Sequence, residues 1–346
     1  MTETLNPSPW WRPDQFARRR PMLDKRQHAL RAVRGYFESQ GFAEVETPAL
    51  QVSPGNETHL HAFKTQFTDY LTRDSRDYYL HTSPEFAMKK LLVAGMPKIF
   101  QIARAFRNGE RSSRHHPEFS MLEWYRAGAG LPDIMQDCVA LVRAAAAACG
   151  VTNFTAQGLS CDPFGAWESL TVSDAFRRYA NIDLMATIGD TAALRAQMTA
   201  NNIRATESDT WDDLFFRALG EHIEPRLGDK HPVFLCDYPV HMAALARPKR
   251  GDARLAERFE LYICGYEIAN AFDELTDAGE QARRFAADMD EKEKLYGERY
   301  PVDADFIAAL HHGMPDSAGI ALGFDRLVML CAGTENIDDV LWVPVA

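Results

Sequence analysis

The spacing of apolar residues along the chain predicts where its first helix and strand lie. Apolar positions from Leu23 to Phe37 recur at intervals that place them on one face of a helix, and Gly41 follows as a stop. Residues 42–50 alternate apolar and polar side chains around a proline, which predicts a strand. Residues 1–21 lack any such period, so we expect an irregular N-terminal arm there.

The rest of the chain continues this mixture of helical and extended patterns. Strands are predicted at 78–82 and 98–106, with a helix at 83–95 between them. Residues 132–149 predict a helix that Asp133 caps and Gly150 ends. Helical patterns follow within 171–230, and 155–230 has the character of an insertion. The remaining patterns predict strands near 232–238 and 256–274, helices near 278–297 and 303–312, and a closing strand and helix at 318–332.

This order of elements predicts the fold class. Strands and helices are interleaved with long spacings and without regular βαβ alternation. We therefore expect an α+β fold, with a mainly antiparallel sheet flanked by helices, in a single domain over residues 22–346.

Composition and charge narrow the classes of function. The 346 residues are 46% hydrophobic, ample for a buried core, and no stretch approaches the roughly 18 apolar residues of a membrane span. The net charge of −11 argues against binding a long run of nucleic-acid phosphates and favours a cationic small molecule or a basic protein surface. Six scattered cysteines without a CxxC pair predict reduced thiols in a cytoplasmic protein.

Residues 106–126 form the first segment with candidate chemistry. The segment reads as strand, polar loop and strand, with Arg107 at its entry and Arg114 near the return. Arginine supplies a planar fork for a phosphate, and an aromatic residue on the return strand supplies a stacking face. The segment is typical of a hairpin that wraps a nucleotide; the alternative is a solvated hairpin with a charged tip.

The second and third segments lie towards the C-terminus. Glu260, Glu267 and Glu274 are seven residues apart, and an odd spacing in a strand directs side chains to opposite faces. A bulge or turn near Gly265 is needed to bring them to one site, where carboxylates would bind Mg²⁺; alternating charge on a solvent-exposed face is the other interpretation. In residues 319–327, GIALGFDRL, small residues allow a ligand to approach the backbone.

Taken together, these segments resemble a known family. The order GFAEVETP, SPE, FRN…RHHPEFSMLEWY, YEIANAFDEL and GIALGFDR resembles the lysyl branch of the class II aminoacyl-tRNA synthetases over about residues 22–332. The resemblance implies an antiparallel sheet flanked by helices and a homodimer whose interface includes Pro48. It also implies an ATP-dependent ligase that forms an aminoacyl adenylate.

The resemblance also implies roles for individual residues. Arg107 would hold the ATP α-phosphate and the reacting carboxylate, Phe119 would stack on adenine, and Arg326 would hold the γ-phosphate. The full ATP set is Arg107, Asn108, Gly109, Glu110, His116, Phe119, Glu267, Ile268, Gly323 and Arg326, with Glu260 and Glu267 as Mg²⁺ ligands. The substrate set is Ser83, Pro84, Glu85, Glu123, Tyr125, Asn270 and Glu274, in which Glu123, Tyr125 and Glu274 face the distal amine.

Departures from the lysyl pattern point to one branch of the family. Too few residues precede the first motif for an anticodon-reading domain, Gly109 then Glu110 replace the usual spacing, His116 replaces asparagine, and Ala321 stands where lysyl enzymes have glycine. With these departures, the chain resembles the stand-alone paralogues that join (R)-β-lysine to a lysine ε-amine of translation elongation factor P. We therefore expect that factor and a lysine isomer as partners, and no tRNA or membrane.

Two rival functions stay open at this point. One is a ligase that transfers α-lysine to tRNA or another carrier, which would need an RNA-binding surface. The other is an amino-acid sensor without catalysis, in which the two ATP arginines would be dispensable.

Overall fold

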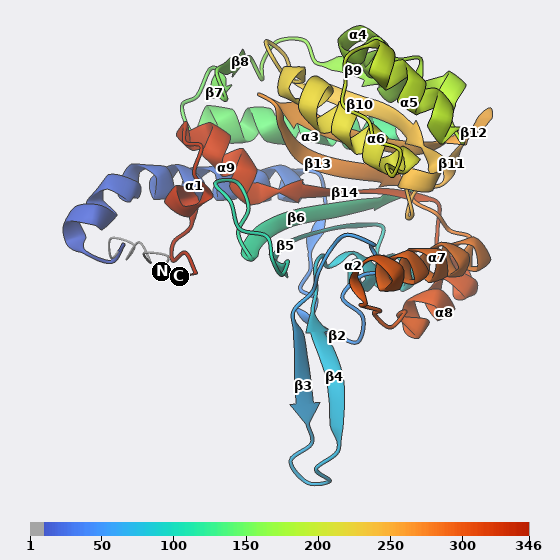
Figure 1. Cartoon of the computed structure of the whole chain (residues 1–346). Coiled ribbons are helices and arrows are strands. Elements are labelled where there is room, and N and C mark those ends of the chain that lie inside the picture. Colours follow the sequence, from blue (N-terminus) through green and yellow to red (C-terminus); the bar gives the residue numbers. More distant parts are fainter. Residues whose placement is uncertain (1–9, 346) are drawn as a thin grey trace, which may run out of the picture.

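A nine-stranded, mainly antiparallel sheet forms the centre of the computed structural model, which describes residues 10–345 (Figure 1). Only the β1–β5 and β9–β10 pairs are parallel. The strands lie in the order β1 (Ala43–Glu44), β5 (Lys98–Phe106), β6 (Glu118–Ala127), β14 (Ser317–Gly323), β13 (Tyr266–Asp273), β12 (Asp252–Ile263), β10 (Val233–Pro239) and β9 (Glu168–Thr171), and β11 (Pro248–Lys249) pairs with β12. The expected fold class is confirmed.

One face of the sheet is covered by helices α1 (Pro13–Ser39), α3 (Leu131–Ala148) and α9 (Phe324–Ala332). Alternate residues of the strands, such as Trp124, Phe259 and Ile320, point to this face and are buried with them. Burying this layer contributes most of the driving force for folding, because it removes the largest apolar area from water. The opposite face of the sheet carries polar side chains on its central strands.

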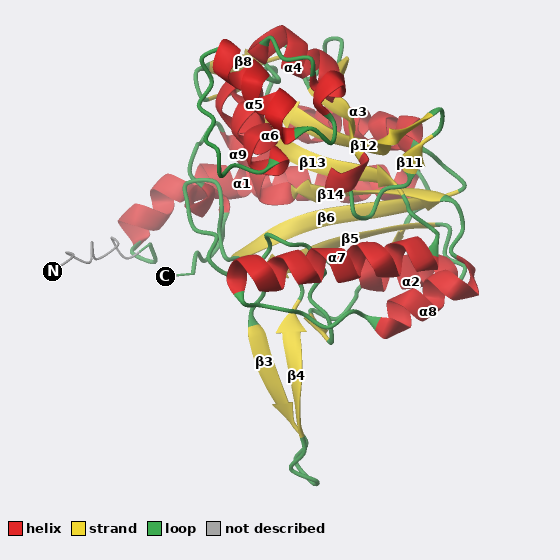
Figure 2. Ribbon diagram, turned by 45° about the vertical axis from the view of Figure 1, so that its right-hand side comes forward, coloured by secondary structure: helices red, strands yellow, loops and turns green. Residues whose placement is uncertain are grey.

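Two groups of helices flank that opposite face and leave strands β6 and β14 uncovered between them (Figure 2). At one end lie α2 (Glu85–Val93), α7 (Ala278–Tyr296) and α8 (Ala304–Gly313), packed on Ile99 and Tyr125. At the other end α4 (Val172–Ala180), α5 (Thr191–Ala200) and α6 (Trp211–Ala218) pack on Tyr238 and Tyr262. Short turns at Leu184–Thr187, Leu219–Ile223, Glu224–Arg226, Val240–Met242 and Ile337–Val340 connect these parts.

A hairpin projects from the body of the molecule below the sheet (Figure 1). It consists of β3 (Lys64–Thr68) and β4 (Ser75–Leu80), with β2 (Leu50–Gln51) paired to the base of β4. A second small hairpin is formed by β7 (Phe154–Ala156) and β8 (Leu159–Cys161). Among the described residues, no helix is both long enough and apolar enough to cross a lipid bilayer.

The structure corrects three sequence predictions near the N-terminus. Helix α1 begins at Pro13, so residues 13–21 of the expected irregular arm are helical; a proline is tolerated in the first helical turn because its missing N–H has no partner there. The rest of that arm, residues 1–9, lies outside the described residues. The strand expected at 42–50 is divided into β1, Ala43–Glu44, and the start of β2 at Leu50, since Pro48 between them has no N–H for a ladder. Strand β3 was not predicted, because its residues are exposed and leave no alternating pattern.

The start of helix α3 also differs from the prediction. Asp133 is not the N-cap: Gly130 is, and the Asp133 carboxylate lies in the first turn, where it accepts a hydrogen bond from the Gly130 N–H at 3.0 Å. The end agrees with the prediction, because Gly150 follows the helix with a φ of 66°.

Candidate active site

The floor of the candidate site is a row of residues that crosses four strands. Cross-strand pairing sets Glu260 opposite Asn270, Asn270 opposite Ala321, and Ala321 opposite Glu123. Residues directly opposite one another in an antiparallel sheet share a face. The row therefore presents its side chains to the face that the two helix groups leave uncovered.

A bulge in β13 brings Glu267 to the same face as Glu260. Leu261 pairs with Ala269 and Tyr262 pairs with Glu267, so Ile268 is an extra residue in the ladder. One extra residue reverses the alternation of the strand beyond it. The bulge expected from the odd spacing of the glutamates is thus present, a few residues after the turn at Cys264–Gly265.

Glu260, Glu267, Asn270 and Ala321 line a cavity of about 420 Å³, large enough for a nucleotide-sized ligand, whereas Glu123, Tyr125 and Glu274 lie outside its lining. Twelve residues of the predicted ATP, Mg²⁺ and substrate sets line the cavity, namely Ser83, Glu85, Arg107, Glu110, His116, Phe119, Glu260, Glu267, Ile268, Asn270, Gly323 and Arg326. Ala321 and Arg114 line it as well. Asn108 and Gly109 lie outside its lining, and Gly109 forms the turn that presents Glu110, with a φ of 84°. Of Gly109 and Glu110, the two residues at the altered spacing, Glu110 is the one that lines the cavity.

Two arginines supply positive charge to this wall. The Arg107 guanidinium lies 5.2 Å from the centre of the Phe119 ring, and its Nε has no hydrogen-bond partner within residues 10–345. Arg326 donates to the Glu267 carbonyl at 2.7 Å and lies 2.8 Å from His115 Nε2. Burial and the Arg326 charge lower the pKa of His115, which keeps this imidazole neutral beside the guanidinium.

His116 is more constrained than its neighbour. Its Nδ1 lies 2.5 Å from the Glu118 carbonyl, and its Nε2 accepts a hydrogen bond from the Val345 N–H at 3.0 Å. Backbone groups therefore occupy both ring nitrogens in this structure.

The carboxylates near the bulge differ in their surroundings. Glu260 accepts hydrogen bonds from Tyr238 and Tyr262 hydroxyls at 2.5 and 2.7 Å and from Arg258 at 2.5 Å. Burial and the charge of Glu260 raise the pKa of Glu267 to about 7. Arg326 Nη1 lies 3.9 Å from Glu267 Oε2 and favours the charged form, but it does not offset these two effects.

A second set of carboxylates is buried between β6, β13 and α2. Glu123 accepts from Ser83 at 2.5 Å and from Tyr125 at 2.8 Å. The ammonium of Lys89 is paired with Glu85 and, at 2.5 Å, with Glu274. Burial acts to lower the pKa of Lys89, but these two carboxylates outweigh it and the pKa is raised.

This buried set holds more acidic groups than cationic groups. Three carboxylates face one ammonium, and Glu274 Oε1 has no hydrogen-bond partner among the described residues. Burial raises the pKa values of Glu123 and Glu274 to about 8. The set is therefore suited to receive further cationic groups. Gly319 is required beside it, because a Cβ there would lie 2.2 Å from the Tyr125 ring and 2.5 Å from Glu274.

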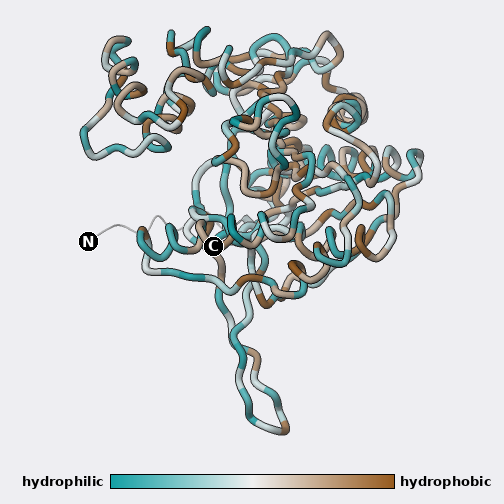
Figure 3. Tube along the Cα trace, turned by 90° about the vertical axis from the view of Figure 1, so that its right-hand side faces the viewer, coloured by the Kyte–Doolittle hydropathy of each residue, from teal (hydrophilic) through white to brown (hydrophobic). Residues whose placement is uncertain are grey.

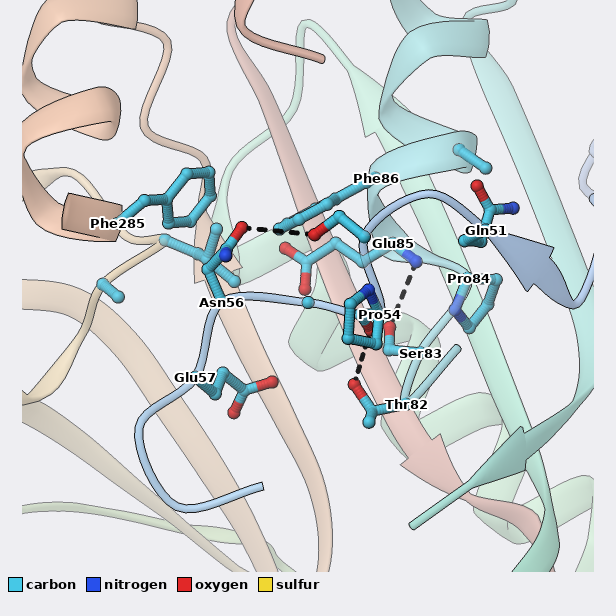
Figure 4. A pocket seen from close by; sticks show the side chains of 15 residues that line it. Gln51, Pro54, Asn56, Glu57, Thr82, Ser83, Pro84, Glu85, Phe86 and Phe285 are labelled. Carbon is cyan, nitrogen blue, oxygen red and sulfur yellow. Dashed lines mark hydrogen bonds between the residues drawn. The ribbon is translucent and has the colours of Figure 1, made fainter. Parts of the chain in front are cut away.

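Sequence reasoning missed several residues of the cavity wall, among them Glu57, Phe216 and Arg258. Arg258 stands two residues before Glu260 on one strand, so the strand period would have placed both on the same face. Phe216 belongs to the segment 171–230, whose sequence shows helical patterns but no chemical motif. Glu57 lies in a loop whose apolar residues show no regular spacing. Pro84, from the substrate set, lines a smaller chamber beside the main cavity (Figure 4).

Comparison with known proteins gives the family. The family of class II tRNA synthetases described as D, K and N matches residues 15–346. A Yersinia enterocolitica protein named elongation factor P–(R)-β-lysine ligase is 39% identical, over 93% of this chain and 94% of its own length. The chain belongs to the elongation factor P–(R)-β-lysine ligase family of class II synthetase-like enzymes.

Further relatives carry the same name. The proteins from Salmonella arizonae and Salmonella paratyphi B are each 38% identical over 99% of this chain and 98% of their own length. The predicted family is confirmed, and membership makes this chain a ligase of a class that uses ATP.

Proposed function

We propose that this protein activates (R)-β-lysine with ATP and transfers it to the ε-amine of a lysine of elongation factor P. The observation that carries the proposal is one cavity that joins Arg107 and Arg326 to a carboxylate-rich wall. Arginines suit a triphosphate, and buried carboxylates suit a substrate with two ammonium groups. The names of the relatives supply the acceptor and the lysine isomer. Such an acceptor implies a cytoplasmic enzyme that needs no tRNA.

In this proposal the amino acid lies across the floor of the sheet. Its distal ammonium contacts Glu123, Tyr125 and Glu274, and its other ammonium faces Glu85 and Asn270. Once the substrate is bound and Glu85, Glu123 and Glu274 are all ionised, their charge less that of Lys89 balances the two ammonium groups of the substrate.

Adenylate formation then requires positioning and charge stabilisation rather than a protein nucleophile. The substrate carboxylate attacks the α-phosphorus in line, and pyrophosphate leaves. Arg107 holds the attacking carboxylate and the α-phosphate, while Arg326 holds the γ-phosphate. His115, kept neutral by burial and by Arg326, orients that guanidinium without repelling it.

Glu260 and Glu267 fit a role as Mg²⁺ ligands. The Glu267 side chain is 42% exposed and lies 3.9 Å from Arg326, so its carboxylate has room to contact a metal ion as well. The Glu260 carboxylate keeps acceptor capacity after its three hydrogen bonds. When bound, Mg²⁺ neutralises charge on the phosphates, and it commonly takes only one or two protein carboxylates. We expect Glu267→Gln to raise the Mg²⁺ concentration needed for activity, and unchanged activity at low Mg²⁺ would contradict this role.

ATP–pyrophosphate exchange with a panel of lysine isomers tests the proposal, followed by transfer to elongation factor P and to tRNA. We expect exchange with (R)-β-lysine and transfer to the protein only. Arg107→Ala and Arg326→Ala should each reduce exchange by about 10²–10³-fold while the thermal transition stays cooperative. Near-normal exchange in either variant would instead favour a sensor, and transfer to tRNA would favour the α-lysine ligase.

A further inference from the structure

The proposed acceptor poses a chemical problem that adenylate formation does not. A lysine ε-amine has a pKa near 10.4, so only about one molecule in 10³ is uncharged and nucleophilic at neutral pH. Attack on the adenylate therefore needs a group that removes a proton from the incoming ammonium. That group must lie beside the reacting carboxyl, which the proposed function puts between Arg107 and Glu85.

Glu57 lies at this position. Its side chain lines both the main cavity and the smaller adjoining chamber, and Ser83, Glu85 and Leu245 are the other residues common to the two (Figure 4). Within residues 10–345 the Glu57 carboxylate takes part in no hydrogen bond or ion pair. It is thus available to accept a proton from a ligand.

The charged groups around Glu57 come from several elements. Arg107 on the nucleotide hairpin, Arg258 on β12 and Lys292 on α7 favour its ionised form, whereas Glu85 on α2 and Asp288 on α7 oppose it. The Glu57 side chain is open to the cavity, yet desolvation by the surrounding walls is the largest influence and leaves its pKa above that of an ordinary glutamate. A raised pKa makes a carboxylate a better proton acceptor while it remains ionised at neutral pH.

The loop that carries Glu57 is held firmly on both sides. The buried Lys292 ammonium donates to the carbonyls of Thr58 and Leu60 at 2.9 and 2.7 Å. The Asn108 N–H donates to the His61 carbonyl at 2.7 Å, which joins the loop to the nucleotide hairpin. These bonds set the position of the carboxylate relative to Arg107.

We propose that Glu57 is the proton acceptor for the acceptor lysine in the transfer step. The ε-ammonium gives one proton to the Glu57 carboxylate, and its nitrogen then forms a C–N bond with the acyl carbon of the adenylate. The C–O bond to the phosphate breaks, AMP leaves with the electron pair, and the second proton of the nitrogen passes to solvent. This inference rests on the proposed function, and Glu57 has no part in adenylate formation.

The test measures the two half-reactions, adenylate formation and transfer, separately in the wild type and in Glu57→Gln. Pyrophosphate exchange with (R)-β-lysine reports adenylate formation, and single-turnover transfer from preformed adenylate to elongation factor P reports aminolysis. We expect the ratio of transfer to exchange to fall by about 10²–10⁴-fold at neutral pH. Wild-type transfer should lose rate as pH falls through the raised pKa of Glu57, whereas transfer by the variant should climb steadily with pH until the acceptor amine itself deprotonates.

Hydroxylamine, which is uncharged at neutral pH, provides a second readout. It needs no base, so Glu57→Gln should capture adenylate as hydroxamate at the wild-type rate relative to exchange. Glu207→Gln, an exposed carboxylate outside both cavities, is the matched control, and Asp288→Asn asks whether the neighbouring acid takes the proton instead.

Several outcomes would overturn the assignment. Glu57 is not the proton acceptor if Glu57→Gln keeps the wild-type pH profile of transfer. The same holds if this variant loses transfer and hydroxylamine capture equally, or if Asp288→Asn loses more transfer than Glu57→Gln does. A raised KM for (R)-β-lysine with an unchanged transfer ratio would make Glu57 a ligand of the substrate amine. If the wild type forms no adenylate with (R)-β-lysine, the proposed function itself is wrong. If it forms adenylate but one of the outcomes above is observed, only the assignment of Glu57 is wrong.

Discussion

At the scale of single residues, Ala321 is the clearest determinant of which lysine isomer fits. It lies in the sheet row between Asn270 and Glu123 and its methyl group faces the cavity. A β-amino acid carries its amine one carbon farther from the carboxylate, so the floor beneath the two groups must differ. We expect Ala321→Gly to move the ratio of kcat/KM for (R)-β-lysine and α-lysine towards α-lysine by about 10-fold or more.

The matched control for this substitution is Ala318→Gly. Ala318 lies on the same strand but on its buried, opposite face, so this variant tests the effect of a glycine in β14 by itself. An unchanged isomer ratio in Ala321→Gly would move discrimination to the groups around the amine, such as Ser83 and Glu85.

Also at the residue scale, the buried carboxylates predict a pH dependence of substrate binding. The pKa values of Glu123 and Glu274, raised to about 8, mean that both groups are largely protonated at neutral pH when no substrate is bound. An ammonium group binds their charged forms, so affinity for (R)-β-lysine should increase as pH rises from about 6 to 9.

Calorimetry in buffers of different ionisation enthalpy measures the protons involved. We expect net proton release on binding at neutral pH, and less release in Glu123→Gln. No net proton release would show that these carboxylates are already ionised in the free protein.

At the scale of elements, a buried ion pair joins the first helix to the last. Arg26 of α1 contacts Asp325 of α9 at 2.5 Å and Ser120 of β6 at 2.7 Å, and the Asp325 carboxylate also accepts from the Ser120 N–H at 2.6 Å. Asp325 directly precedes Arg326, so this contact positions the helix that presents the proposed γ-phosphate ligand. Arg26→Met leaves the aspartate charge buried without a partner, and we expect the free energy of unfolding to fall by about 3–5 kcal/mol.

Urea denaturation measures this loss, and an exposed pair on the same helix provides the control. Arg20 and Asp24 are 61% and 42% exposed, so Arg20→Met should cost less than about 1 kcal/mol. Similar losses in the two variants would show that the buried pair adds no more than a surface pair.

At the scale of the whole molecule, apolar side chains near β2 predict a homodimer. Val52 is 49% exposed, and Leu50 and Phe67 nearby are 41% and 49% exposed. The hairpin beyond them is largely hydrophilic (Figure 3), and Tyr70 and Leu71 in its terminal turn are 81% and 87% exposed. Exposed apolar residues on neighbouring strands that follow Pro48 in the chain are typical of an association surface.

Sedimentation of wild type and Val52→Asp tests this prediction. We expect a dimer for the wild type and at least a ten-fold weaker dimer for the variant, since a buried carboxylate without a partner opposes association. Leu295→Asp is the control, because Leu295 is equally exposed, at 49%, on helix α7. A monomeric wild type would contradict the expected homodimer.

Much of this protein follows from the sequence by itself. Helix α2, strand β5 and the last strand and helix lie close to their predicted bounds, since their hydrophobic periods are strong. The spacing of Glu260 and Glu267 required a bulge, and the bulge is present. The order of the motifs along the chain indicates the family, because each motif combines unusual residue types at a fixed spacing.

Only the tertiary structure decided which distant side chains share the site. Lys89 faces Glu274 across the amine set, and Glu57 lies beside Arg107, although no local pattern links either pair. Strand register and the anchoring of the 53–61 loop produce these contacts, and both depend on packing between segments far apart in the chain. Periodicity reports which face of an element is buried, but it carries no information about what meets that face or about residues in a loop without a period.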